Sequence, residues 1–553
     1  MTGRPKPALR GTEIMSALRS YAASSGLRSE EHRKYREFFV DVGVDNLKTL
    51  GSPDWQVIYG RRGTGKTHLL GYFAASEKER SSSWVIETTA QRLQQRTVGR
   101  SLPLVERARQ RFISLLASVA ESLALAAETR LVQLPERGDP RIAILRDNVT
   151  SDLVQLLDLA EAGLASTLLG DDDRSEPARR LYSDRSNYVS VAEAFGNLVI
   201  TILERLAIPR LYICIDEWST LDPTGGPVIQ PEFADLLKIA FKGTDRISVK
   251  IATNRFQTRF SNQSAGRSFR GLELGADIEE AINLDHVTMG HEELNEFYLE
   301  LIFKRLEALE PKLSSFRGAG GGISSEFVSS LFHDHRAFEQ LVIGADAIPR
   351  NFLRTVSKLY ADRGYDPRHR WKAGLIANEL KTRGAEGGRT VGYRTQAHQL
   401  MTSAIRPVVR GSGRREFLAR REDIARLKRG FEELFEKRLI HEISESHLPH
   451  DARDGHEGFR LDYGVLLDWL DLTYDEAQPG RGRRQTIVDD SRWSSLVINV
   501  DKVRIERLEC PFCYTEFSPE DHAFRARGLC PNCFEETHLE DPSASAVSSP
   551  DDL

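Results

Sequence analysis

The residues with the clearest chemistry lie at positions 60–67, where the chain reads Gly-Arg-Arg-Gly-Thr-Gly-Lys-Thr. A short apolar run at 57–59 precedes them and an apolar helical pattern follows, so the spacing predicts a strand, a phosphate-binding loop and a helix. Glycines let backbone N–H groups turn around a triphosphate, and the positive end of the helix dipole faces its charge. Lys66 would contact the β- and γ-phosphates, and the Thr67 hydroxyl would bind Mg²⁺. We therefore predict ATP contacts from Gly60, Gly63, Thr64, Gly65, Lys66, Thr67 and His68.

Two adjacent carboxylates, Asp216 and Glu217, follow a continuously apolar run at 211–215. Such a run predicts a strand buried on both faces of a sheet, and ligands bind beyond the carboxyl ends of such strands. Asp216 would hold Mg²⁺, directly or through water, and Glu217 would orient and deprotonate the attacking water. Taken alone, the pair is equally well explained as an acidic surface turn, and the upstream loop favours the catalytic interpretation.

A third strand is predicted at 247–252, and it ends in Thr253, Asn254 and Arg255. A polar side chain at this strand end can contact the γ-phosphate or the attacking water. We choose Asn254, with Thr253 and Arg255 as alternates, because a shift of one residue in register reverses which side chain faces the site. Arg350, in the first turn of a helix near Pro349, would bridge a helical lid and the γ-phosphate. The predicted catalytic residues are therefore Lys66, Glu217, Asn254 and Arg350, and Arg255 joins the predicted nucleotide-binding residues.

Three further arginines, Arg259, Arg267 and Arg270, lie in or beside a loop rich in Ser, Gly and Asn. One of them could reach the nucleotide of a neighbouring subunit, in which case the ATPase domain would form a homo-oligomer. A solvated basic loop is the simpler alternative.

Four of the five cysteines form two Cys-x-x-Cys pairs, at 510–513 and 530–533. This spacing is typical of structural zinc sites, in which four thiolates close a tetrahedral shell. We predict that Cys510, Cys513, Cys530 and Cys533 bind Zn²⁺ and that the metal stabilises a module with little core of its own. Two redox-active dithiols are the alternative. The fifth cysteine, Cys214, lies in an apolar strand and is expected to be an inert core residue, and this cysteine usage indicates a reducing cytosol.

The composition favours a cytoplasmic protein with several domains. The chain has 553 residues, of which 40% are hydrophobic, and a formal net charge of −5. Its length suggests about three or four domains. The mild charge means that any contact with nucleic acid must come from a local basic patch. We expect no signal peptide and no membrane span, because the N-terminus lacks an apolar run and no uncharged apolar stretch reaches about 18 residues.

Hydrophobic periodicity arranges the motifs in a series of modules. We predict an α/β fold, in which a three-layer α/β/α P-loop sheet domain and a helical lid precede a winged-helix domain and a small four-cysteine zinc ribbon. The predicted boundaries are an N-terminal helical segment at 1–44, the ATPase domain at 45–290 with a helical insertion at about 95–190, the lid at 291–365 with helices at 293–309, 325–332 and 348–360, a linker at 366–400, the winged helix at 401–475, a basic linker at 476–505, the ribbon at 506–536 and a disordered tail at 537–553.

The winged helix is predicted from a helix at 422–437, a strand at 439–443, a polar turn and a second strand at 459–463. Its helical part carries a diluted basic patch: Arg414, Arg415, Arg420, Arg421, Arg426, Lys428 and Arg429. We expect DNA as its partner. A protein-binding winged helix or a solvated charged face has equal weight, and the zinc ribbon could also bind a protein.

The order of these motifs resembles the AAA+ ATPases, most closely the origin-recognition and initiator clade, over roughly residues 45–470. The resemblance implies that Asn254 is sensor 1 and Arg350 is sensor 2. It also implies that ATP binding is coupled to oligomerisation and to duplex DNA binding. Two features depart from the initiators: the helical insertion, and the Thr253-Asn254-Arg255 strand end, which resembles the Thr-x-Arg strand end of the STAND signalling ATPases. In that class Arg255 would sense the phosphate.

These observations lead to an expected function with one alternative. We expect an ATP-hydrolysing molecular switch that binds DNA, in replication, mobile-element or phage-defence biology. The alternative is a STAND-like signalling scaffold whose C-terminal modules bind protein. The zinc ribbon fits neither family closely, and no internal repeat of the kind usual in STAND sensor domains is present in the sequence.

Overall fold

The computed structural model describes residues 38–40, 46–80, 83–95, 104–132, 140–168, 185–222, 228–262, 269–285, 291–309, 311–318, 321–363, 370–392, 395–443, 448, 455–470, 496–501, 503, 508–510, 516–517, 522–532, 534 and 536–537. The chain divides into two compact units. The sheet unit comprises residues 45–60, 66–283 and 508–553, and the helical unit comprises residues 1–44, 61–65 and 284–507. Residues 61–65, here called the loop tip, therefore belong to the helical unit.

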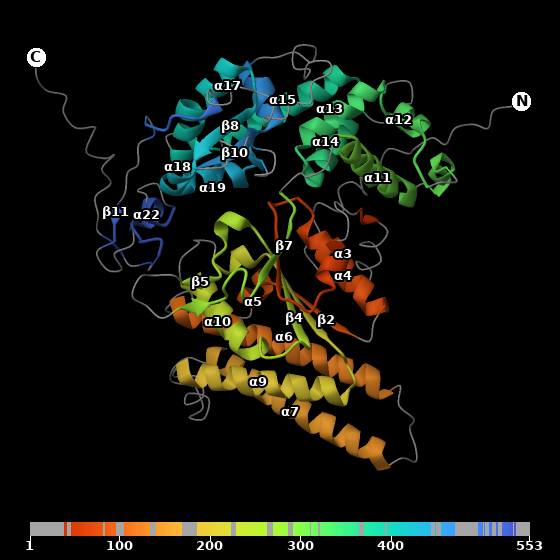
Figure 1. The fold of residues 1–553 in the computed structure, drawn as a ribbon, viewed down its shortest axis with the longest axis vertical. Helices are drawn as coiled ribbons and strands as arrows, with labels where there is room; N and C mark the ends of the chain where they lie inside the picture. Colours follow the sequence, from red (N-terminus) through yellow and green to blue (C-terminus); the bar gives the residue numbers. More distant parts are fainter. Residues whose placement is uncertain are drawn as a thin grey trace, which may run out of the picture. The chain divides into compact units, whose positions relative to one another are not determined.

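A five-stranded parallel sheet forms the centre of the sheet unit (Figure 1). Its strands lie in the order β2 (Trp84–Thr89), β3 (Leu211–Asp216), β4 (Ile247–Thr253), β1 (Gln56–Tyr59) and β7 (Glu279–Asn283). Every neighbouring pair is parallel. All residues of β1, β3 and β4 are buried, as expected for parallel strands with both faces covered. The predicted α/β fold with a parallel sheet is confirmed.

Helices pack on this sheet and on one another. They are α3 (Asn46–Leu50), α4 (Lys66–Arg80), α5 (Ala90–Gln95), α6 (Leu104–Val132), α7 (Pro140–Leu168), α9 (Arg185–Arg205) and α10 (Ile229–Phe241). The region predicted as a helical insertion is built into the core, because α6, α7 and α9 lie side by side and share one hydrophobic cluster with the sheet (Figure 1). Phe112 of α6 packs edge-on against Phe233 of α10, with 6.1 Å between the ring centroids.

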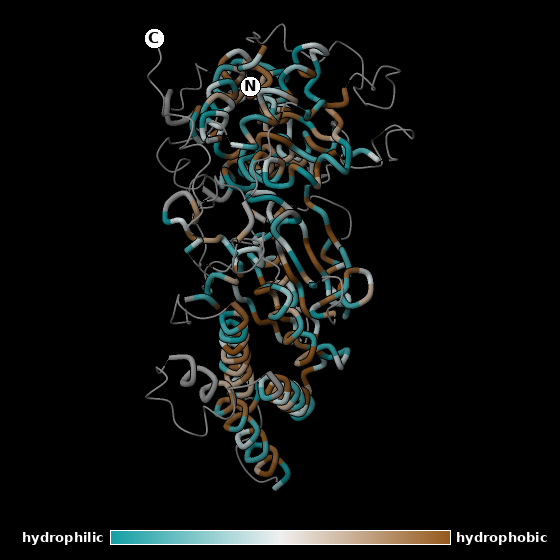
Figure 2. Tube along the Cα trace, turned by 90° about the vertical axis from the view of Figure 1, so that its left-hand side faces the viewer, coloured by the Kyte–Doolittle hydropathy of each residue, from teal (hydrophilic) through white to brown (hydrophobic). Residues whose placement is uncertain are grey.

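Among the described helices, α6 is long and apolar enough in composition to cross a membrane. Most of its apolar stretch is buried within the sheet unit. Figure 2 shows hydrophobic and hydrophilic residues alternating along the long helices, which is the pattern of helices that bury one face. We therefore interpret α6 as a core helix.

The sheet unit also contains short elements: the 3-10 helices η1 (Trp218–Leu221) and η2 (Arg255–Gln257), the antiparallel pair β5 (Ser261–Asn262) and β6 (Arg270–Gly271), and, near the C-terminus, β11 (Leu508–Glu509), β12 (Glu516–Phe517) and α22 (His522–Arg527).

The described part of the lid region contains the three predicted helices and two helices that were not predicted. They are α11 (His291–Leu309), η3 (Pro311–Phe316), α12 (Ser325–Leu331), α13 (His335–Ala345) and α14 (Pro349–Arg363). The sequence interpretation did not include α13, which begins where the Asp334 side chain accepts a hydrogen bond from the Ala337 N–H at 3.0 Å. Asp334 at this capping position is the sequence signal that could have located α13.

Within the predicted linker at 366–400, the structure has a long helix, α15 (Ala373–Arg389), which packs against α13 and α21. Its buried face, with Ile376 and Leu380, was obscured by the Gly- and Arg-rich composition. Gly384 lies where α15 meets α21 (Tyr463–Leu470). A Cβ atom there would come within 2.1 Å of the Gly464 carbonyl carbon, so the close approach of the two helices requires glycine.

The C-terminal module, residues 396–470, consists of α16 (Gln396–Gln399), the π-helix η4 (Leu400–Ile405), α17 (Arg406–Ser412), β8 (Glu416–Arg420), α18 (Arg421–Arg426), α19 (Lys428–Glu436), β9 (Ile440–Ile443), β10 (His456–Leu461) and α21. Its three strands form an antiparallel sheet in the order β8-β10-β9. The helix predicted at 422–437 is divided into α18 and α19 at the buried Leu427, and β8 was not predicted.

Part of the predicted basic linker at 476–505 also belongs to this module. The Ile498 N–H donates to the Leu418 carbonyl of β8 at 2.9 Å, and Leu496, Ile498 and Val500 are buried. Three predicted regions lie wholly or mostly outside the described residues. They are the N-terminal segment, of which only residues 38–40 are described, residues 471–495 of the linker, and the tail beyond 537.

Candidate nucleotide site

The backbone of the predicted phosphate loop requires two of its glycines. The Gly60 N–H donates to the Thr253 carbonyl at 3.1 Å, which joins the start of the loop to the end of β4. Gly63 and Gly65 then have φ values of 102° and 106°, which residues with a Cβ rarely adopt. The chain enters α4 at Lys66. Strand, loop and helix therefore follow one another as the motif predicts.

The loop helix and the acidic strand end meet within the sheet unit. The Thr67 hydroxyl donates to Asp216 Oδ2 at 2.5 Å, although 149 positions separate the two residues. Lys66 Nζ donates to the Gly60 carbonyl, so the lysine folds back over the loop. A hydroxyl and a carboxylate side by side are oxygen ligands of the kind that Mg²⁺ takes, with waters completing its shell. These two residues therefore fit a Mg²⁺ ion.

Glu217 has a strained backbone at the end of β3. Its φ is 57° and ψ is 36°, a left-handed conformation that costs a residue with a Cβ roughly 1–2 kcal/mol. Its N–H donates to Asp216 Oδ1 at 2.8 Å, and its carbonyl accepts from the Thr220 N–H at 2.8 Å. The turn thus places two carboxylates with different backbone orientations at one strand end, and such strain is common at functional sites.

The end of β4 lies between the other two segments, because β4 separates β1 from β3 in the sheet. Thr253 is buried and its hydroxyl shares a hydrogen bond with the Thr258 hydroxyl at 2.6 Å. Asn254 is half-buried and Arg255 is exposed. Thr253 is therefore committed to the turn, and Asn254 and Arg255 remain the candidates for contact with the γ-phosphate.

The other predicted residues of the sheet unit are less informative. His68 lies half-buried in the first turn of α4. Of the three arginines considered as fingers, Arg270 forms an ion pair with the buried Glu232 at 3.3 Å, Arg259 is exposed, and Arg267 lies outside the described residues.

In the helical unit, the start of α14 contacts the loop tip. The Arg350 N–H donates to the Gly63 carbonyl at 3.3 Å. A Cβ atom on Gly63 would lie 2.8 Å from Arg350 Cβ and 3.3 Å from Ile348 Cγ2. The structure therefore brings Arg350 to the loop through its backbone, in the first turn of its helix as predicted.

Arginines converge around the loop tip. Arg438, between α19 and β9, donates to Asn351 Oδ1 of α14 at 3.0 Å. Its pKa is lowered to about 10 by burial and then by the charges of Arg350, Arg354, Arg61 and Arg62. Like charges gathered in this way favour an anion such as a triphosphate. No sequence pattern pointed to Arg438, since it follows a helix otherwise interpreted as part of the winged helix.

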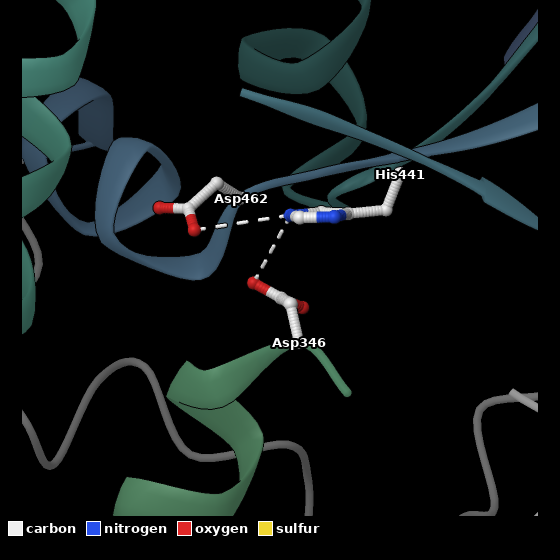
Figure 3. Close-up of side chains that lie close together, drawn as sticks. All are labelled: Asp346, His441 and Asp462. Atoms are coloured by element: carbon white, nitrogen blue, oxygen red, sulfur yellow. Dashed lines mark ion pairs between the residues drawn. The ribbon is translucent and has the colours of Figure 1, made fainter. Parts of the chain in front are cut away.

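A second cluster of the helical unit, Asp346, His441 and Asp462, was also missed. His441 Nε2 lies 3.5 Å from Asp346 Oδ2 and 3.8 Å from Asp462 Oδ2 (Figure 3). The donor set could hold a metal ion. However, Asp346 already accepts from Arg415 at 2.6 Å and from the Tyr463 N–H at 3.0 Å.

Asp462 is satisfied in the same way. It accepts from Arg383 at 3.0 Å and from the Gly464 N–H at 2.9 Å. Since both carboxylates are hydrogen-bonded and neutralised by arginines, the cluster is a buried polar network rather than a metal site.

Two of the four predicted zinc ligands lie in one small core. Cys510 and Cys530 are fully buried in a cluster with Phe517 and Phe524. The Asn532 N–H donates to Cys530 Sγ at 3.4 Å, a contact that favours a thiolate. Cys513 and Cys533 lie outside the described residues. The two described cysteines, Cys510 and Cys530, are thiol ligands of the kind that a structural zinc ion takes. Cys214 is buried in β3, where burial raises the pKa of its thiol.

Among known proteins, this chain is similar to several solved structures. No family model and no curated protein sequence matches the chain. The chain is similar to Cdc6p from Pyrobaculum aerophilum, with 12% identity and a TM-score of 0.28, over 82% of this chain and 97% of that one. It is also similar to a Walker-type ATPase of Pyrococcus abyssi, with 14% identity and a TM-score of 0.33, over 81% and 96% of the two chains.

Proposed function

We propose that this chain is an AAA+ molecular switch that binds and hydrolyses ATP. The observation that carries the proposal is the contact between Thr67, in the phosphate-loop helix, and Asp216, at the end of the acidic strand. A glycine-dependent loop, a lysine and a hydroxyl–carboxylate pair in one place are the parts that phosphoryl transfer to water requires.

Each residue has a distinct task in this mechanism. Lys66 exchanges the Gly60 carbonyl for the β- and γ-phosphate oxygens. Thr67 and Asp216 would hold Mg²⁺, which would neutralise phosphate charge. Glu217 accepts the proton of the attacking water, whose oxygen bonds to the γ-phosphorus while ADP leaves. Asn254 orients that water, and Arg350 reports the γ-phosphate to the lid.

Two substitutions separate binding from hydrolysis. Lys66→Ala removes the charge that holds the phosphates, so we expect loss of ATP binding. Glu217→Gln keeps the shape of the site without a base, so we expect ATP binding with turnover reduced about 10²- to 10⁴-fold. Lys78→Ala, on the exposed face of the same helix as Lys66, is the control. Binding and phosphate release are measured for all three, and wild-type turnover by Glu217→Gln would remove it as the base.

For the partner, we propose DNA bound through one edge of the C-terminal module. The exposed basic residues gather at the end of β8, on α18 and in the first turn of α19: Arg420, Arg421, Arg426, Lys428 and Arg429. Arg420 lies 3.8 Å from Glu422, and Arg426 lies 2.9 Å from Asp423. The rest of α19 carries Glu432, Glu433 and Glu436, which disfavour phosphate contact. We therefore assign the contact to the exposed basic residues of α18 and the first turn of α19, and not to the acidic remainder of α19.

A salt titration of duplex DNA binding tests this assignment. Charge-driven binding weakens steeply with salt, and Arg421→Glu combined with Arg426→Glu should abolish it. Arg389→Glu, exposed on α15, is the matched control. Absence of binding at low salt favours the alternative, a STAND-like scaffold whose C-terminal modules bind protein.

A further inference from the structure

One side chain of the loop tip is buried in the helical unit. Arg61 is 2% exposed. Its backbone N–H and its Nε both donate to Asp285 Oδ1, at 2.9 and 2.8 Å. Its Nη1 donates to the Ile440 carbonyl of β9 at 3.2 Å and contacts His441 Nδ1. Its guanidinium also lies 4.8 Å from the Phe435 ring centroid.

The partner of Arg61 defines the protonation of His441. A guanidinium only donates hydrogen bonds, so Nδ1 must accept and the ring proton must be on Nε2. That nitrogen faces Asp346 and Asp462 (Figure 3). Burial and the charge of Arg61 lower the pKa of His441, in agreement with a neutral ring. His441 therefore contacts Arg61 through Nδ1, and its Nε2 lies 3.5 Å from Asp346 Oδ2 and 3.8 Å from Asp462 Oδ2.

These residues connect the lid with the C-terminal end of β10. Asp346 lies between α13 and α14, and Asp462 lies between β10 and α21. Two residues after Arg61, Gly63 contacts Arg350 of α14. The loop tip is thus fixed at two points, by a buried ion pair and by close backbone packing. Removing one partner of a buried ion pair destabilises a protein, because the other charge stays buried without compensation. Separating Arg61 from Asp285 would therefore carry a large free-energy cost.

We propose that Arg61 is a positioning residue that holds the loop tip in its nucleotide-binding shape, and that the C-terminal module thereby sets the affinity for ATP. The inference rests on the proposed function, since it assigns a regulator to the same nucleotide site. Arg61 does not contact the nucleotide in this arrangement, because its guanidinium is occupied by Asp285, β9 and His441. By thermodynamic reciprocity, a ligand that displaces β9 lowers ATP affinity, and ATP stabilises the C-terminal module.

The test perturbs the anchor from the side of the C-terminal module, in the full chain. His441→Leu removes the acceptor for Arg61. His441→Asn keeps an acceptor near the position of Nδ1. Gln340→Leu is the matched control, because Gln340 is buried in α13 and donates to the Tyr463 hydroxyl at 2.9 Å. Two quantities are measured: the Kd of mant-ATP with Mg²⁺, and hydrogen exchange of peptides covering residues 56–70 without nucleotide.

We expect His441→Leu to raise the Kd by about tenfold, equivalent to about 1.4 kcal/mol, and to accelerate exchange in the loop. His441→Asn should restore both quantities, and Gln340→Leu should leave both unchanged. In a double-mutant cycle, Arg61→Met and His441→Leu should be less than additive, because each single substitution already removes the Arg61–His441 contact, whereas Arg61→Met also removes the contacts with Asp285 and the Ile440 carbonyl.

The outcomes distinguish this inference from the proposed function. Absence of mant-ATP binding by the wild-type chain contradicts the proposed function. Wild-type binding with an unchanged Kd and unchanged loop exchange in His441→Leu contradicts the positioning role of Arg61. Equal losses in His441→Leu and Gln340→Leu also contradict it, since they would show general destabilisation.

Discussion

The contact between the loop tip and α14 predicts that two neighbouring glycines respond differently to the same substitution. Gly63 and Gly65 have nearly equal φ values, 102° and 106°. A Cβ atom on Gly63 would lie 2.8 Å from Arg350 Cβ, whereas a Cβ atom on Gly65 would have no atom within 4 Å. Alanine at 65 therefore measures the backbone penalty alone, and alanine at 63 measures that penalty together with a steric clash.

The two effects can be given magnitudes. A positive φ costs a residue with a Cβ roughly 1–2 kcal/mol, and both variants carry this cost. Overpacking adds about 1–3 kcal/mol for Gly63→Ala, because the nearest atoms are close to the backbone of α14 and cannot move aside. The extra destabilisation corresponds to a further decrease in Tm of at least about 2 °C for a unit of this size.

Thermal unfolding without nucleotide and without added Mg²⁺ is the appropriate assay, because both variants also disturb the phosphate site. We expect the Tm of Gly63→Ala to lie below that of Gly65→Ala, and the Tm of Gly65→Ala to lie slightly below wild type. Equal Tm values for the two variants would refute the packing of the loop tip on α14.

Three further predictions follow from the site and the network. Asn254→Ala should lower kcat with little change in ATP affinity, and Arg255→Ala should leave kcat unchanged; the reverse result in a steady-state assay supports the STAND-like alternative. The purified protein should contain about one zinc per chain, and Cys513→Ser or a strong chelator should remove it; a zinc content near zero in the wild-type chain contradicts the ribbon. His441 has a pKa below its ordinary value of 6.5 in the folded protein, so the unfolded chain binds more protons between the two values. Stability should therefore fall as the pH decreases below 6.5 toward the lowered pKa of His441, and less so in His441→Asn; parallel Tm–pH curves for the two proteins would show that this group does not carry the effect.

The parts of the fold that local sequence determines were predicted well. The continuous apolar runs of β1, β3 and β4 and the loop from Gly60 to Lys66 are specified by residues close together in the chain. For that reason the parallel sheet and the order of its motifs could be predicted. The meeting of Thr67 with Asp216 followed from the rule that ligands bind at the carboxyl ends of parallel strands.

The parts that depend on distant contacts were not predicted. Arg61 occupies a variable position of the motif, and its partners Asp285 and His441 lie 224 and 380 positions away. No local pattern marks such a pair. In a similar way, α15 carries several glycines that lower its apparent helix propensity, and its contact with α21 at Gly384 overrides that tendency.

The proposed nucleotide site requires that a triphosphate and its metal ion bind where the loop at Lys66 meets the acid at Asp216. The most direct measurement is calorimetric titration of a non-hydrolysable ATP analogue, with and without Mg²⁺, into the wild-type chain and into Thr67→Val and Asp216→Ala variants. We expect Mg²⁺ to strengthen binding to the wild-type chain, and we expect both substitutions to abolish that gain. Binding that is unchanged by Mg²⁺ in the wild-type chain, or a Mg²⁺ effect that survives both substitutions, would contradict this site.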